Sequence, residues 1–142
     1  MKKMKMNPVK LILSGMLLLI FSACSKKITF LTSPVVPAAR GNVSVKKDNN
    51  NNYKIQVDLD GLAEVSRLQP PKKMYIVWMT SDVNTTKNIG QIKSSTGFMS
   101  KNLKASFATV AATKPNKIFI TAEDDESVQY PAGEVVLTTD NF

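Results

Sequence analysis

The chain has 142 residues, a formal net charge of +8 at pH 7, one cysteine and no histidine. This length suits one domain, and the missing histidine excludes Ser-His-Asp and Cys-His catalysis as well as zinc sites built on imidazole. Four of the 19 basic residues lie in the first ten positions, so the rest of the chain has a surplus of only about four positive charges over its 11 acids. We expect no nucleic-acid binding, because no basic stripe interleaved with aromatic residues follows. We also expect no cofactor.

The amino-terminal residues 1–23 predict a cleaved signal peptide. Met1–Lys10 holds four lysines and no acid, and Leu11–Phe21 is an apolar run. The run is too short to cross a bilayer of about 30 Å as a stable helix. Small residues, Ser22 and Ala23, separate it from Cys24. This order of charge, apolar run and small residues indicates export.

The stretch Phe21-Ser22-Ala23-Cys24 resembles the lipobox of bacterial lipoproteins. The resemblance implies cleavage between Ala23 and Cys24 and a diacylglyceryl group on the cysteine sulfur. Phe21 departs from the pattern, since leucine is the commonest residue there. The alternative is a secreted protein whose free thiol lies near the cleavage site. If acylated, Cys24 is unable to form a disulfide and becomes the membrane attachment, because two or more acyl chains anchor stably.

The residues after Cys24 predict where the anchor resides. Ser25 replaces the aspartate that is associated with inner-membrane retention, and Lys26 and Lys27 are basic where a surface-export signal is acidic. We therefore expect the periplasmic face of the outer membrane, with the inner membrane and the cell surface as alternatives. Lys26 and Lys27 also suit a mild attraction to anionic membrane surfaces.

Residues 24–39 predict an acylated cysteine followed by a flexible tether. Pro34 and Pro37 oppose regular structure and favour extended backbone. The alternative for this segment is an edge strand, which its three apolar residues would support: Ile28, Phe30 and Leu31.

Residues 40–142 predict one all-β domain. Short segments alternate apolar with polar residues, and turn signals separate them. Asn49–Asn52 predicts the turn of a hairpin, because asparagine tolerates positive φ. Seven segments carry the strand pattern: 43–45, 53–59, 74–80, 88–93, 103–107, 118–122 and 135–137.

The predicted fold class is a single immunoglobulin-like or fibronectin-like antiparallel sandwich of about seven strands. The segment Met74–Thr80 is apolar on both faces, which predicts a central strand covered on both sides. Trp78, on the third predicted strand, matches the buried tryptophan common in this architecture.

Four short motifs resemble, in order, the extracytoplasmic domain of anti-sigma-K factors: Tyr75-Ile76-Val77-Trp78, Ile89-Gly90-Gln91-Ile92, Ile118–Glu123, and Tyr130–Leu137 with its Pro131-Ala132-Gly133 turn. The resemblance spans roughly residues 53–138 and implies an extracytoplasmic regulatory module. Those regulators also carry a sigma-binding domain and a membrane-spanning helix, and this sequence shows no counterpart. Any such role is therefore expected to act through another protein.

The candidate contact and metal residues lie on predicted loops. Phe98, Met99 and Tyr130 are candidate contacts to a partner. The alternative for Phe98 and Met99 is packing under the sandwich edge, and the alternative for Tyr130 is packing beside Pro131. The acidic run Glu123-Asp124-Asp125-Glu126 is a candidate calcium site, because calcium prefers oxygen ligands; a solvated turn explains it equally well.

Three functions fit these features. The first is a non-catalytic binding or scaffold module with a partner protein in the cell envelope, and the second is the regulatory module described above. The third is a small hydrolase, which needs two carboxylates facing each other across a groove. Its candidate acids are Glu64, Glu123, Asp124, Asp125, Glu126 and Glu134.

Overall fold

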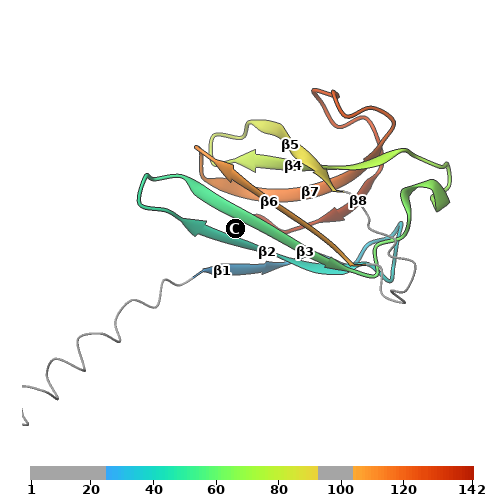
Figure 1. Cartoon of the computed structure of the whole chain (residues 1–142), viewed down its shortest axis with the longest axis horizontal. Coiled ribbons are helices and arrows are strands. Elements are labelled where there is room, and N and C mark those ends of the chain that lie inside the picture. The colour runs from blue at the N-terminus through green and yellow to red at the C-terminus, as the bar shows by residue number, and fades with distance from the viewer. Residues whose placement is uncertain (1–24, 93–103) are drawn as a thin grey trace, which may run out of the picture.

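The computed structural model describes residues 25–92 and 104–142, which form two antiparallel four-stranded sheets packed face to face (Figure 1). The first sheet has the strand order β1-β2-β3-β6, and the second has the order β5-β4-β7-β8. The all-β sandwich predicted from the sequence is therefore confirmed. The strands are β1 (Lys26–Thr29), β2 (Arg40–Lys47), β3 (Tyr53–Asp60), β4 (Met74–Ser81), β5 (Thr86–Ile92), β6 (Ala105–Ala111), β7 (Pro115–Glu123) and β8 (Val135–Thr138).

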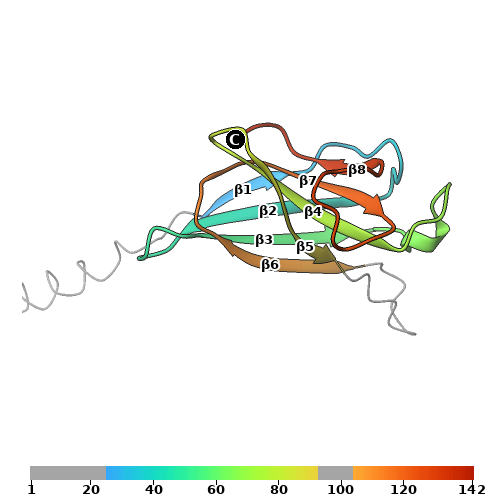
Figure 2. The ribbon, with the colours of Figure 1, turned by 90° about the horizontal axis from the view of Figure 1, so that it is seen from above.

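The connections give the sandwich its immunoglobulin-like character. Four connections stay within one sheet, namely β1–β2, β2–β3, β4–β5 and β7–β8, whereas the chain crosses between sheets after β3, after β5 and after β6. A turn of 3-10 helix, Val65–Arg67, lies in the first crossing. Seen from above, β4 and β5 pass obliquely over β2 and β3 (Figure 2). Such an oblique crossing is typical of two twisted sheets that pack face to face.

The core lies between the sheets and follows from the alternation in the sequence. In β3 the residues Ile55, Val57 and Leu59 are buried, while Lys54, Asp58 and Asp60 are exposed. Gly90 in β5 adopts φ +141°, and a Cβ there would lie 2.6 Å from the Phe107 ring of β6. The glycine therefore lets the two sheets approach at this edge.

The hairpin between β2 and β3 has the turn that the sequence predicts. The Asp48 carboxylate accepts hydrogen bonds from the backbone N–H groups of Asn50 (2.8 Å) and Asn52 (2.9 Å). Asn51 adopts φ 63°, which asparagine tolerates. The prediction of a turn over Asn49–Asn52 is confirmed.

The segment predicted as a flexible tether, residues 24–39, is instead part of the fold from Lys26 onward. Strand β1 pairs with β2, and the next two N–H groups join both sheets: Phe30 donates to Gly41 O (3.1 Å) and Leu31 donates to Thr138 O (2.9 Å). The edge-strand alternative is correct, because burial of apolar side chains and pairing of backbone groups outweigh the two prolines. The folded domain begins before Arg40. Four residues of the segment are buried: Phe30, Ser33, Val36 and Ala39.

Strand β4 is covered on both faces, as its sequence predicts. Tyr75, Val77 and Met79 belong to the cluster between the sheets, whereas Ile76 and Trp78 are equally buried and do not. Successive side chains of a strand point to opposite faces. Trp78 therefore lies on the outer face of the second sheet, so the match to the tryptophan buried between immunoglobulin sheets is wrong in its placement.

Several predicted features lie outside the described residues: the signal peptide 1–23, Cys24, Phe98 and Met99. Across residues 25–92 and 104–142, no helix has the length and apolar character needed to cross a membrane.

Candidate functional site

A loop of residues 124–134 between β7 and β8 is held by a buried polar network on the outer face of the second sheet. Trp78 Nε1 donates to Thr121 Oγ1 (2.8 Å), and this hydroxyl donates to Glu123 Oε1 (2.6 Å). The same carboxylate oxygen accepts the backbone N–H groups of Ala132 (3.1 Å) and Gly133 (2.9 Å). Two consecutive backbone N–H groups bonded to one side-chain oxygen fix the end of the loop that leads into β8.

Gly133 lets the loop reach this position. A Cβ at residue 133 would lie 1.8 Å from the carbonyl oxygen of Ala122, a contact that no side chain tolerates. Glycine is required here for the close approach of two backbones.

The middle of the loop is held by β5. Asn88 Nδ2 donates to the carbonyl oxygens of Glu126 (3.1 Å) and Val128 (3.2 Å). Within the loop, the backbone N–H and the hydroxyl of Ser127 both donate to Asp125 Oδ1 at 2.8 Å, and these bonds lower the pKa of Asp125. The loop thus has side-chain contacts at two separate points.

Tyr130 projects from this fixed loop into solvent. Its side chain is 80% exposed, so the packed alternative for this residue is wrong. The ring borders a surface cavity of about 580 Å³, a volume within the range of small-ligand pockets. The cavity is lined by Thr85, Thr86, Lys87, Asn88, Glu126, Ser127, Gln129 and Tyr130.

The predicted calcium site over Glu123–Glu126 is not formed. The buried Glu123 carboxylate is taken up by the network, Asp124 pairs with Lys72 Nζ (2.7 Å), and Asp125 binds Ser127. Over residues 25–92 and 104–142, no three carboxylate, cysteine or histidine side chains are grouped to hold a metal ion. The run follows the end of β7, where its side chains find different partners.

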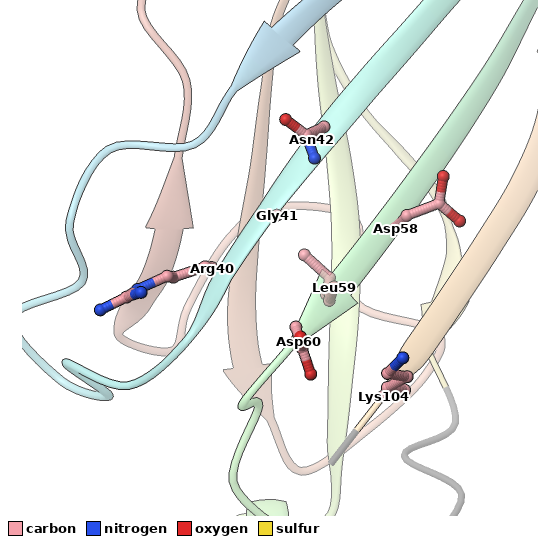
Figure 3. A pocket seen from close by; sticks show the side chains of 7 residues that line it. All are labelled: Arg40, Gly41, Asn42, Asp58, Leu59, Asp60 and Lys104. Carbon is pink, nitrogen blue, oxygen red and sulfur yellow. The ribbon is translucent and has the colours of Figure 1, made fainter. Parts of the chain in front are cut away.

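A second hollow lies on the outer face of the first sheet (Figure 3). It has a volume of about 370 Å³, and Arg40 and Lys104 border it on opposite sides. Asp58 and Asp60, two residues apart on β3, point to this same face. This carboxylate pair was not among the residues predicted from the sequence, although the strict alternation of β3 is the signal that places both acids on one exposed face.

The six acids proposed for a hydrolase do not meet across a groove. Glu123, Asp124 and Asp125 are engaged as described above. Glu64 pairs with Arg67 (3.2 Å). Glu126 lines the cavity beside Tyr130, and Glu134 lines a separate cavity near Leu68. Asp58 and Asp60 share a hollow, but both stand on one strand. Glycoside hydrolysis needs two carboxylates on facing walls of a groove.

The motif residues that resemble the anti-sigma-K domain come together in space. Trp78, Glu123 and Gly133 belong to the one network that holds the β7–β8 loop, so these residues have a structural role. Comparison with protein-family models, curated proteins and solved structures finds no match for this chain. The likeness to the regulatory domain stays a prediction.

Proposed function

We propose that this chain is an envelope lipoprotein, anchored through Cys24 at the periplasmic face of the outer membrane, whose sandwich binds a partner without catalysis. The observation that carries the binding role is the 80% exposed Tyr130 on a loop fixed by Glu123 and Asn88. Tyrosine is enriched among the residues that dominate binding energy at interfaces. A loop that is already ordered loses less conformational entropy on binding.

The surroundings of Tyr130 suit a partner with both apolar and polar groups. The ring supplies apolar area, and the adjoining cavity supplies hydroxyl, amide and charged groups from β5 and the loop. The non-catalytic part of the proposal is supported by the engagement of Glu123, Asp124 and Asp125 with other groups, together with the absence of histidine from the chain.

The test is affinity capture of the full chain from gently solubilised membranes. We expect a reproducible partner with the wild type and at least a tenfold loss of recovery with Tyr130→Ala, because a central aromatic contact is commonly worth more than about 1.4 kcal/mol. Val110→Ala is the matched control, since Val110 is also exposed (57%) but lies on β6 of the first sheet. Recovery of no partner, or equal recovery with Tyr130→Ala, would contradict the proposal.

A further inference from the structure

One end of the sandwich gathers the start of the described chain, its last residue and three turns. Lys26 pairs with Val45 near the end of β2, and Lys26 Nζ lies 5.5 Å from the centroid of the Phe142 ring. The Phe142 N–H donates to Asn116 O (2.8 Å) near the start of β7. In Figure 1 the β2–β3, β4–β5 and β6–β7 turns lie at this same end.

This end carries most of the lysines of the described chain, and we name it the basic end. Against its lysines stand three aspartates, of which Asp48 accepts the backbone N–H groups of its own turn. The ion pairs of the described residues lie elsewhere, at Glu64–Arg67 and Lys72–Asp124. The basic end comprises Lys26, Lys27, Lys46, Lys47, Lys54, Lys114 and Lys117, with Asp48, Asp82 and Asp140 as its acids.

The outer face of the first sheet shows how the charge is concentrated. Lys46 and Lys54 stand directly opposite each other on β2 and β3, an arrangement that is unfavourable for like charges. Lys27 pairs with Ser44 on the same face, and Val110, 57% exposed, pairs with Lys54 from the other side. Three exposed lysines thus share one face, with an exposed apolar side chain beside Lys54, and an external anion is the natural partner for their charge.

We propose that the basic end lies against an anionic lipid surface and orients the domain on the membrane. The inference rests on the proposed anchor, because Cys24 precedes Ser25 and the first strand starts at Lys26. Clusters of about four to eight basic residues beside a membrane attachment bind acidic headgroups. The lysines of this surface that lie in strand pairs, Lys27, Lys46 and Lys54, belong to the first sheet, whereas the loop that carries Tyr130 is held on the second sheet.

The test uses the protein purified from native membranes, on vesicles of phosphatidylcholine alone and of an equimolar mixture with phosphatidylglycerol. A fluorophore is placed on Asn50→Cys, in the turn at the basic end, or on Ser66→Cys, in the connection that leaves the opposite end of β3. A quencher on the lipid headgroups reports proximity. On the mixed vesicles we expect at least twofold stronger quenching at residue 50 than at residue 66, and we expect the difference to shrink at high salt.

Two charge-matched triple variants decide whether the basic end is responsible. Lys27→Gln, Lys46→Gln and Lys54→Gln together should abolish the difference in quenching. The control, Arg40→Gln, Lys73→Gln and Lys104→Gln together, removes three exposed cations away from the basic end and should preserve the difference. Equal quenching at both labels, or equal loss in both triple variants, would overturn the proposal.

Flotation separates this inference from the proposed anchor. A chain that floats with phosphatidylcholine vesicles but shows no preferred orientation on the mixed vesicles is anchored, and the inference then fails alone. A chain that floats only with the mixed vesicles, with residue 50 quenched, supports the basic end and contradicts the anchor. A chain that floats with neither overturns both. If the basic end bound single-stranded nucleic acid as tightly as it binds the mixed vesicles, it would be a general polyanion site, and the lipid proposal would also be overturned.

Discussion

The outer faces of the two sheets differ in what covers them. On the first sheet, β3 presents exposed Lys54, Asp58 and Asp60 to solvent. On the second sheet, Ile76 and Trp78 of β4 are buried beside the loop that Glu123 holds. The difference explains why β3 alternates strictly and β4 is apolar throughout: a strand with one wet face needs polar residues at every second position, and a strand covered twice does not.

The largest expected effect comes from removing the side chain that anchors the covered face. Trp78→Ala should lower the free energy of unfolding by about 3–5 kcal/mol, because it empties a fully buried site and leaves Thr121 without its donor. Urea unfolding followed by circular dichroism measures this. Gln56→Ala, at mid-strand on the open face of β3, should change stability by less than about 0.5 kcal/mol. Similar losses in the two variants would break the comparison.

The next effect tests whether the loop needs its glycine. Gly133→Ala should destabilise by roughly 1–3 kcal/mol, since the new Cβ meets the Ala122 carbonyl and must push the loop away from Glu123. Hydrogen exchange at the Ala132 amide should accelerate together with the loss in urea stability. The neighbouring Ala132→Ser is the control, because residue 132 is exposed and its N–H bond is retained. An unchanged exchange rate in Gly133→Ala would show that the network does not hold the loop.

A third effect concerns the inner face of β4 at high pH. Burial raises the pKa of Tyr75 to about 12, and its hydroxyl donates to Ala63 O (2.9 Å). The unfolded phenol ionises near pH 10, so the stabilising contribution is complete below pH 10 and is lost as pH rises toward 12. The wild type should lose on the order of 2 kcal/mol more than Tyr75→Phe over this window. Parallel losses in urea unfolding at pH 9 to 12 would contradict the burial of this group.

The smallest effect belongs to the open face of the first sheet. Lys54→Glu replaces a like-charge pair with an opposite-charge pair across from Lys46, and we expect a gain of about 0.2–1 kcal/mol. Raising the salt concentration should shrink the gain, because exposed charges are screened. A loss of stability at low salt would show that the two ammonium groups do not interact as the pairing implies.

The strands were predictable because one physical rule, the alternation of buried and exposed side chains, shows both where a strand lies in the sequence and which of its side chains face the core. Asn51 at positive φ and the doubly buried β4 were also local signals. The edge strand β1 was underestimated because Pro34 and Pro37 dominate the composition of that segment, whereas its stability depends on distant partners, Gly41 and Thr138. No pattern within the segment identifies such partners.

The site was less predictable than the fold. In the sequence Glu123 is part of an acidic run, but its carboxylate accepts backbone N–H groups nine and ten residues away and the hydroxyl that accepts from Trp78. Only tertiary contacts separate it from Asp124 and Asp125. The exposure of Tyr130 depends equally on the path of the loop, which Gly133 and Asn88 determine together.

The attachment at Cys24 is the claim on which the proposed function and the orientation of the basic end both depend. Mass spectrometry of the amino-terminal peptide, from protein purified out of native membranes, tests it directly, with fractionation of Cys24→Ala as its partner experiment. We predict a peptide that begins at Cys24 and carries acyl chains, and a Cys24→Ala variant that is lost from the outer membrane. A peptide that begins at Met1, or an unmodified thiol at Cys24, would contradict the claim.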